Sequence, residues 1–477
     1  MRAVIALIAA TALLRLAFAA STGLGVDESY MVAAGRMLSG GYFDHPPAAW
    51  WLSWGASHLL GTEAPLAVRL PFIGLFGLTT WLMFRLGCAV ADAQAGFWAA
   101  VLLNLSPVFG VTGGTWVLPD GPLLCALTGA ALCLVRATAP SSPTMTAGRW
   151  WCGAGVCAGL AMAAKYSAVL TIGGAFLFLL CDRRQRHWLA RPAPYVAALI
   201  AGAVFSPVVI WNATHGWASF AFQGGRAVGL RFHPFAPVTV LLGEGLFVLP
   251  WIWAPMLALL VRGKPRLLAF LAAPPIAAFA AIAAWSSQRV LYHWAAPGYL
   301  MLFPALGEAV AARVHLPWVR RTIIGTAVFI LVALTAIAAQ IQFDIVGDRL
   351  ASLMRKDPTM EGIDWVSIRS DLEQRGLLAP GTVVGVANWR DGGKIAYALG
   401  PDVTVLCLNA DARQFGFAYP PADFVGRDVL LVGLTPVDGP FERIEPLPSA
   451  SIRHRGRVLA PVSVAIGHRL IAWPPGK

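Results

Sequence analysis

The sequence predicts a mainly α-helical, polytopic membrane protein with a small C-terminal α/β domain. Of its 477 residues, 57% are hydrophobic and only 13% are charged, whereas an ordinary soluble domain has roughly 25% charged residues. The hydrophobic residues form long runs, and the seven Cys stand without any CxxC pair. These observations exclude a soluble single-core enzyme, a disordered chain and a disulfide scaffold.

The hydrophobic runs predict the membrane spans. Because a helix needs about 20 mostly apolar residues to cross a bilayer, we expect about eleven transmembrane helices. The first run could also be a signal peptide, but we expect an uncleaved span because the chain continues as a multi-span protein. The expected spans are 3–21, 66–86, 95–113, 121–138, 150–164, 167–181, 193–211, 238–261, 267–285, 295–312 and 322–341.

The basic residues predict the orientation. With the N-terminus in the cytoplasm, the dense basic clusters at 183–191, 262–266 and 313–321 fall on the inside, and the outer loops carry only scattered ones. This bias explains much of the net charge of +12 without nucleic acid as a partner. We therefore expect a membrane domain at 1–341 with a long first outer loop at 22–65.

Residues 342–477 predict a separate outer domain. Charged residues, Gly and Pro return there, and short Val-rich runs bounded by Gly and Pro indicate strands. Two helical segments, 365–375 and 392–399, alternate with some of these runs, so we expect a small α/β domain. The expected strands are 382–387, 403–408, 429–434 and 463–472. The domain carries no nucleotide fingerprint, zinc spacing or internal repeat.

Reactive side chains gather in the loops of the outer face, whereas the inner loops carry mainly Arg. A carboxylate can act as a general base, and Lys or Arg can neutralise a leaving phosphate. Trp and Tyr can stack on sugars at the headgroup level. The pattern favours a site for a lipid-linked phosphosugar. The candidates are Asp27 and Glu28 for catalysis, and Tyr42, Asp44, His45, Asp120, Lys165, Tyr166, Arg289, Tyr292 and His293 for substrate binding.

These motifs resemble those of the GT-C membrane glycosyltransferases, and more narrowly the branch of protein O-mannosyltransferases and the bacterial lipid A aminoarabinose transferase. The resemblance covers roughly residues 1–300 and rests on the following motifs: Asp27-Glu28, Tyr42-Phe43-Asp44-His45-Pro46-Pro47, Arg69-Leu70-Pro71, Pro119-Asp120, Lys165-Tyr166-Ser167 and Trp211-Asn212 with His215-Gly216-Trp217.

The resemblance implies a GT-C fold and an inverting glycosyltransferase. It implies a polyprenyl-phosphate sugar as donor and a lipid, glycan or protein as acceptor. Asp27 takes the role of the family's catalytic base, with Glu28 beside it. The expected location is the bacterial inner membrane, with the site and the C-terminal domain facing the periplasm, among membrane lipids.

One departure from the family pattern bears on the donor phosphate. The aminoarabinose transferases usually have Glu-Lys-Pro-Pro where this chain has Asp44-His45-Pro46-Pro47. That Lys is thought to meet the phosphate, and His45 could do so only when it is protonated. We therefore expect a different donor, acceptor or phosphate ligand, with Lys165 or Arg289 carrying more of the charge.

Each candidate also has a purely structural alternative. An Asp often caps a helix, so Asp27 could cap one that starts at Glu28, whose own carboxylate suits a first turn. The 44–47 segment could be a rigid turn, and Asp120 a turn residue. Lys165 and Arg289 could be interfacial anchors. Asn212 and His215 could merely cap and end a helix, whereas Glu244, within a span, is a weaker functional candidate.

No cofactor is expected with certainty, and a divalent metal is left open. Asp44, His45 and His215 could form a metal site, but no spacing forces them together. Two other functions are alternatives. A transporter or flippase of lipid-linked sugars would place its polar residues near the midplane and often show internal repeats, which are absent from the sequence. A scaffold with no catalytic function leaves the clustered carboxylates unexplained.

Overall fold

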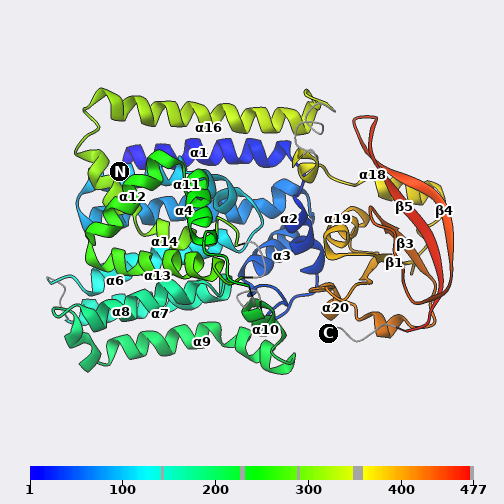
Figure 1. Ribbon diagram of the computed structural model, residues 1–477, viewed down its shortest axis with the longest axis horizontal. Coiled ribbons are helices and arrows are strands. Elements are labelled where there is room, and N and C mark those ends of the chain that lie inside the picture. Colours follow the sequence, from blue (N-terminus) through cyan, green and yellow to red (C-terminus); the bar gives the residue numbers. More distant parts are fainter. Residues whose placement is uncertain (141–143, 226–230, 287–289, 348–357, 473–477) are drawn as a thin grey trace. The chain divides into compact units, whose positions relative to one another are not determined.

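The computed structural model describes residues 1–140, 144–225, 231–286, 290–347 and 358–472 (Figure 1). The chain forms two compact units. The first consists of Met1–Ala17, Gly40–Ala49 and Arg69–Leu334, and the second of Phe18–Ser39, Trp50–Val68 and Thr335–Lys477. Arg289 lies outside the described residues, so its expected role in the site stays a prediction.

The first unit is built of helices, as the hydrophobic runs predict. It contains all or most of α1 (Arg2–Ser21), α4 (Pro65–Val90), α5 (Ala93–Asn104), η1 (Val108–Gly113), α6 (Asp120–Ala137), α7 (Thr144–Ala164), α8 (Ala168–Cys181), η2 (Arg186–Ala190), α9 (Ala193–Thr214), α10 (Ala218–Gly225), α11 (Ala236–Val248), α12 (Pro250–Arg262), α13 (Arg266–Ala283), α14 (Ala296–Leu300), α15 (Phe303–Ala311) and α16 (Pro317–Phe343).

Six helices in the described part of the chain are long and apolar enough to cross a membrane, namely α1, α4, α6, α9, α13 and α16. Three shorter helices, α8, α11 and α12, are also apolar. The protein is therefore a multi-pass membrane protein, as the composition indicates. The expected number of about eleven spans stays a prediction.

Three of the expected spans are interrupted helices rather than continuous ones. The span expected at 238–261 is divided between α11 and α12 at Leu249, whose φ is 84°, directly before Pro250. Proline lacks the N–H that would continue the helix. The Ser106 hydroxyl donates a hydrogen bond of 3.1 Å to the Val248 carbonyl, which the break leaves without a helical partner. The other two interruptions separate α5 from η1 and α14 from α15.

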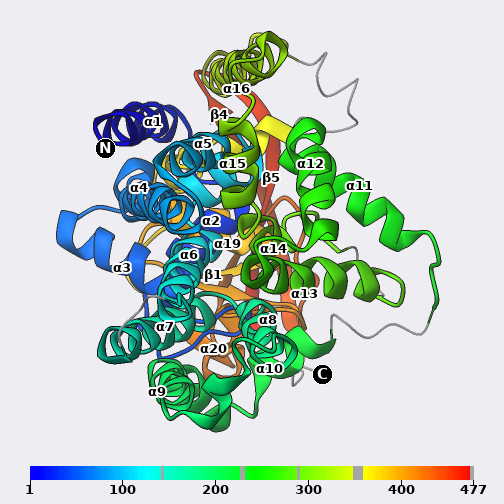
Figure 2. The same cartoon turned by 90° about the vertical axis from the view of Figure 1, so that its left-hand side faces the viewer.

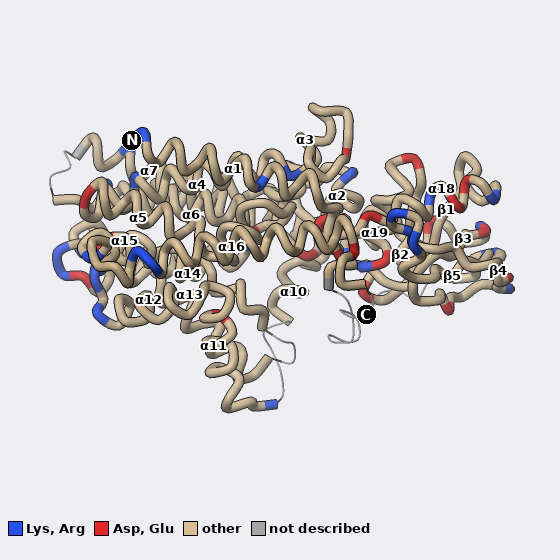
Figure 3. Tube along the Cα trace, turned by 90° about the horizontal axis from the view of Figure 1, so that it is seen from above, with Lys and Arg blue, Asp and Glu red and all other residues tan. Residues whose placement is uncertain are grey.

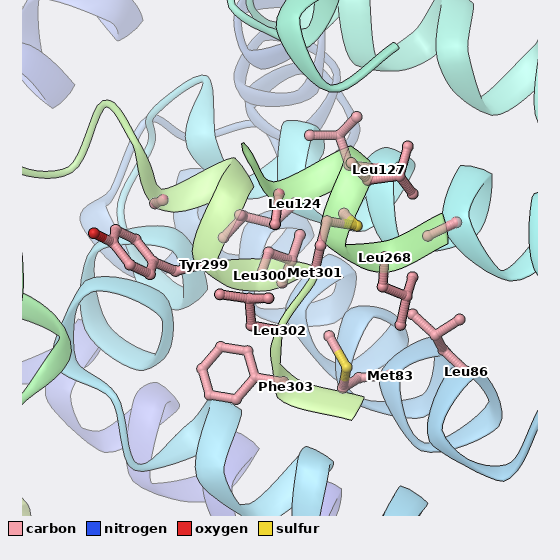
Figure 4. Packing of buried hydrophobic residues seen from close by; sticks show 14 of the residues in the cluster. Met83, Leu86, Leu124, Leu127, Leu268, Tyr299, Leu300, Met301, Leu302 and Phe303 are labelled. Carbon is pink, nitrogen blue, oxygen red and sulfur yellow. The ribbon is translucent and has the colours of Figure 1, made fainter. Parts of the chain in front are cut away.

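The core of the first unit lies around the short helix α14. Seen along the long helices, α14 is surrounded by α6, α8 and α13 (Figure 2). Its closeness to α13 requires a glycine, because a Cβ on Gly298 would lie 2.6 Å from the Ala272 carbonyl oxygen. The side chains around Leu300 and Met301 include Leu124, Leu127, Leu268 and Met83 (Figure 4). This core fixes the start of α6, where Asp120 lies.

The second unit contains a five-stranded mixed sheet with the order β2-β1-β3-β5-β4. Strand β1 (Val383–Val386) pairs in parallel with β2 (Thr404–Cys407) and β3 (Val429–Gly433). Strand β5 (Arg457–Leu470) is antiparallel to both β3 and β4 (Phe441–His454). The shorter helices of this part are η3 (Pro358–Gly362), α18 (Ser367–Gln374), α19 (Trp389–Leu399), α20 (Phe415–Ala418) and η4 (Pro421–Phe424).

The small α/β domain is confirmed, with one strand more than the sequence predicts. The four expected strands correspond to β1, β2, β3 and β5, and the two expected helices to α18 and α19. Strand β4 was not predicted because Pro446 and Pro448 interrupt its sequence. It lies at the edge of the sheet, where a missing N–H need not break a ladder.

Parts of the first outer loop belong to the second unit. Helix α2 (Val26–Ala34) packs extensively against α19, and most of α3 (Ala48–Leu60) belongs to this unit as well. Arg36 follows α2 and forms an ion pair of 2.7 Å with Glu63. It also donates to the carbonyls of Ala396 and Gly400 near the end of α19. The proposed division of the chain at residue 341 stays a prediction.

Candidate functional site

A buried ion pair connects two of the expected site residues in the first unit. The Lys165 Nζ lies 3.0 and 3.2 Å from the two carboxylate oxygens of Asp120. Only 12% of the Lys165 side chain and 9% of the Asp120 side chain are exposed. Asp120 is the first residue of α6 and Lys165 follows the last turn of α7, so each charge suits the helix dipole beside it.

Two expected histidines accompany this pair. His45 and His293 both interact electrostatically with the Asp120 carboxylate. They come from the 40–47 segment and from the turn before α14, far apart in the sequence. A protonated imidazole would add positive charge next to Lys165. In the first unit, Lys165, His45 and His293 therefore all lie close enough to the Asp120 carboxylate to interact with its charge.

The 40–47 segment is fixed against α9 and α10. A Cβ on Gly41 would lie 3.0 Å from the Trp211 side chain, so any larger residue would require that side chain to shift. The rings of Phe43 and Phe222 lie 4.7 Å apart. The Gln223 side-chain amide donates a hydrogen bond to the Asp44 carbonyl. These contacts bury the segment.

Asp44 and Tyr42, two expected site residues, are almost fully buried at 2% and 0% exposure. Buried side chains of this kind need partners, and a carboxylate especially so. Asp44 lies close enough to Tyr166 to act on its hydroxyl electrostatically. The structure therefore places Asp44 near Tyr166, which lies in the turn between α7 and α8.

Tyr166 is the hydrogen-bonding centre of that turn. Its hydroxyl lies 2.7 Å from the Ser219 hydroxyl and is also hydrogen-bonded to the Asn212 side chain. Burial raises the pKa of Tyr166, and the Asp44 carboxylate raises it further. The phenol therefore stays protonated around neutral pH and can donate a hydrogen bond.

Three polar residues that were not predicted as ligands contact this group. Asn212 and Ser219 are fully buried, and Gln223 holds Asp44 as described. Ser219 and Gln223 are four residues apart in an otherwise apolar helix, a spacing that places them on one face and could have indicated their role. Arg69, in one of the family motifs, is only 1% exposed.

Asn212 and His215 lie at the end of α9, as expected if they cap and end that helix. Asn212 donates to the Val208 carbonyl and accepts from the Phe220 N–H. His215 follows α9 as its C-cap residue, and its ring stacks on Trp211 with centroids 4.3 Å apart. Both residues organise the end of α9. Asn212 additionally bonds Tyr166.

Tyr292 packs on α11. A Cβ on Gly243 would lie 2.2 Å from the Tyr292 ring, and the Phe247 ring lies 5.4 Å away. The neighbouring Glu244 is completely buried, and its Oε2 accepts a hydrogen bond of 2.7 Å from Tyr299. Trp253 in turn donates to the Tyr299 hydroxyl. This carboxyl therefore belongs to a hydrogen-bonded chain inside the helices.

Asp27 and Glu28 lie in the second unit, in the first turn of α2. The N-cap is Gly25, and the Glu28 Oε2 accepts a 2.8 Å hydrogen bond from its N–H, as in a capping box. Because α2 begins at Val26, Asp27 lies in its first turn and is not the N-cap residue that we considered. Glu28 is 3% exposed, whereas the Asp27 side chain is exposed.

The segment before α2 is held by a buried lysine. The Nζ of Lys394, which is 1% exposed, donates to the carbonyls of Leu24, Glu361 and Ile363. The Leu24 N–H also donates to the Asp364 carboxylate at 3.1 Å. Residues of the C-terminal domain therefore set the path of the chain immediately before the acidic pair.

Helix α2 itself is held by an aromatic cluster. Tyr30 lies against Trp50, Trp389 and Phe415 with ring centroids 5.2 to 5.6 Å apart. The Gln414 N–H donates to the Tyr30 hydroxyl at 2.9 Å. The rotation of α2, and with it the direction in which Asp27 projects, is fixed by these contacts.

The described residues contain no group of three His, Cys, Asp or Glu side chains that could hold a metal ion. The set considered from sequence, Asp44, His45 and His215, does not form such a group. His215 is instead engaged with the Trp211 carbonyl at 2.8 Å.

Residues 44–211 match the model of the family described as dolichyl-phosphate-mannose-protein mannosyltransferase. This range contains Asp44, His45, Asp120, Lys165 and Tyr166, the larger part of the buried group in the first unit. No curated protein sequence matches the chain.

Two solved structures are similar over nearly the whole chain. The crystal structure of ArnT from Cupriavidus metallidurans bound to undecaprenyl phosphate has a TM-score of 0.64 and 14% identity, and the match covers 98% of this chain and 99% of that one. The apo structure of the same protein has a TM-score of 0.63 and 15% identity, with 97% of each chain covered. The likeness at this identity establishes the fold.

Proposed function

We propose that this chain, a GT-C fold membrane protein of the O-mannosyltransferase and ArnT type, is an inverting glycosyltransferase that uses a polyprenyl-phosphate sugar as donor. The acceptor is a hydroxyl or amine of a lipid, glycan or protein. The single observation that carries the proposal is the buried group around Lys165 and Asp120, the larger part of which lies inside the matched family range.

The Lys165 ammonium and the neighbouring imidazoles suit a phosphate. An ammonium has three N–H donors, and Asp120 accepts at most two of them, so Lys165 keeps a donor for a phosphate oxygen. His45 and His293 add charge when they are protonated. The positive charge of these residues replaces that of the Lys that the aminoarabinose transferases usually have at the position of His45. The Tyr166 phenol supplies a further neutral donor.

The reaction that follows is a single displacement. The Asp27 carboxylate takes the proton of the acceptor hydroxyl or amine, whose electron pair forms the new bond to the anomeric carbon. The bond from that carbon to the phosphate oxygen breaks, and its electron pair leaves with the polyprenyl phosphate. Attack opposite the leaving group inverts the anomeric centre. Lys165 stabilises the charge that develops on the phosphate.

We assign the reaction to the non-cytosolic face of the membrane, the periplasm in a bacterium. The assignment rests on the dense basic clusters of the loops opposite the motif-bearing ones. A donor that is anchored in the membrane by its polyprenyl chain suits a site at this face. Membrane lipids surround the site, and no nucleic acid is involved.

The test is a transfer assay with the purified full-length chain in liposomes and a panel of synthetic polyprenyl-phosphate sugars. We expect at least one donor to yield free polyprenyl phosphate together with a glycosylated acceptor of inverted anomeric configuration. If the protein instead moves an intact lipid-linked sugar across the bilayer, it is a flippase. Retained configuration in the product would reject the single displacement.

A further inference from the structure

A cavity of about 300 Å³ lies among α5, α12, α15 and α16 of the first unit. Its lining shares no residue with the buried group around Lys165. The walls are apolar, with Leu102, Ile252, Leu306 and Val319 among them. A volume of this size is at the lower end of those that hold small molecules or parts of larger ones.

Two helices that line the cavity are joined by a hydrogen bond. The Trp251 indole N–H of α12 donates to the Thr326 hydroxyl of α16 at 2.9 Å, and both residues line the cavity. From Trp251 the lining follows α12 to Arg262, its last residue. At 1.5 Å per residue this stretch is about 16 Å long. The cavity is therefore an elongated groove along a helix.

The end of the groove opposite Trp251 carries two arginines. Arg262 ends α12, Arg313 follows α15, and both line the cavity. Arg313 donates one hydrogen bond to the Ala309 carbonyl, so most of its five N–H donors remain for a ligand. Trp318, 62% exposed, lines the same end.

This end of the first unit is strongly basic. Figure 3 shows Lys and Arg concentrated around the ends of α12 and α15. Lys264, Arg320 and Arg321 lie within two residues of the lining in sequence, and the acidic residue of α15 is Glu308, next to the lining residue Ala309. Two further carboxylates on the same expected side are engaged, since Asp182 is paired with Arg266 at 3.2 Å and Asp92 accepts from the Ala95 N–H at the start of α5. The mouth of the groove thus has a surplus of positive charge.

We infer that this groove binds an anionic glycerophospholipid of the leaflet opposite the proposed catalytic face. The guanidinium groups of Arg262 and Arg313 hold the phosphate, because their planar forks match its oxygens. One acyl chain lies along the apolar wall toward Trp251. The Trp318 ring sits at the headgroup level, where indoles are favoured. Basic pockets between transmembrane helices are suited to acidic lipid headgroups.

The lining also explains how such a lipid would enter. Trp251, Ala258 and Trp318 are exposed on the surface of apolar helices. A lipid can therefore approach laterally from the bilayer without crossing polar loops. A soluble phosphate compound would gain the arginine contacts but leave the apolar wall empty, which disfavours it.

The test is lipid binding to the purified, delipidated full-length chain by native mass spectrometry. Phosphatidylglycerol and phosphatidylcholine with identical acyl chains serve as ligands. Both lipids carry a phosphate, but only phosphatidylglycerol has a net negative charge, so we expect the two arginines to bind it about tenfold or more tightly. Equal binding of the two lipids would overturn the inference, as would displacement of phosphatidylglycerol by an equimolar polyprenyl phosphate.

Two variants and one control locate the site. The double substitution Arg262→Gln/Arg313→Gln should reduce the preference to less than about twofold. Ala258→Phe, at an exposed lining position, should weaken both lipids alike by filling the groove. The control Arg183→Gln/Arg184→Gln removes two exposed charges on the same expected side and should keep the full preference. The inference fails if the control loses the preference, or if either cavity variant behaves as wild type.

Discussion

At the scale of residues, the central feature is the Lys165–Asp120 ion pair. Both residues could be named from the sequence, because each is a charge beside a hydrophobic run on the face that should carry few charges. Their pairing could not be predicted, since 45 residues separate them and only the packing of α6 and α7 brings them together. The spacing of Ser219 and Gln223 on one face of α10 is visible in the sequence, but their partners, Tyr166 and Asp44, are not.

The pair predicts a non-additive effect on stability. Lys165→Met leaves the nearly buried Asp120 carboxylate without its cation, so we expect a loss of about 3–5 kcal/mol. The double variant Lys165→Met/Asp120→Leu should recover most of that loss, because two apolar side chains replace the pair. Thermal unfolding in detergent measures both. A double variant as unstable as the single one would show that the two charges do not stabilise each other.

At the scale of elements, helix α2 and α19 are coupled. The sequence predicts a helix after Asp27 and another at 392–399, and both are present as α2 and α19. Their mutual packing was not predictable, since it depends on contacts between residues more than 350 positions apart, such as Lys394 with the Leu24 carbonyl. The C-terminal domain thereby acts as the support of the acidic segment.

This coupling predicts which segment becomes less protected from amide hydrogen exchange when Lys394 is replaced. Lys394→Met leaves three carbonyls without their donor, and each unsatisfied buried group costs about 1–3 kcal/mol. We expect faster amide hydrogen exchange at 23–30. Arg390→Gln on the same helix is the control, because its exposed ion pair with Glu361 contributes little. Unchanged exchange in Lys394→Met would remove the support role.

Hydropathy located the helical elements well but not their interruptions. A window of apolar residues does not distinguish one helix from two that are joined by a residue such as Leu249 before Pro250. Likewise β4 was missed because its prolines argue against a strand until its place at the sheet edge is known. The positions of elements are local properties, whereas their breaks and edges depend on the tertiary structure.

At the scale of the whole molecule, the distribution of charge defines the proposed orientation. The GT-C fold and the multi-pass membrane character could be predicted from composition, hydropathy and motif order. The side of the membrane follows only from the basic loops, so it needs a direct experiment. The proposed functions differ accordingly: sugar transfer at the non-cytosolic face and phospholipid binding at the cytosolic one.

The orientation predicts opposite locations for two reporter insertions. A fusion after residue 188, in the Arg-rich segment that follows α8, should report the cytoplasm, and one after residue 400, at the end of α19, the opposite side. Paired alkaline phosphatase and fluorescent protein fusions measure this. Both fusions reporting the same side would overturn the topology.

The measurement that tests the central claim most directly is sugar transfer by Asp27→Asn from a synthetic polyprenyl-phosphate donor. Asp27 is exposed at the start of α2, so the isosteric change should leave the fold intact. Loss of a general base should slow transfer by about 10²–10⁴-fold. Asp402→Asn, an exposed carboxylate elsewhere in the same unit, should transfer at the wild-type rate. Transfer by Asp27→Asn at the wild-type rate would contradict the assignment of Asp27 as the base.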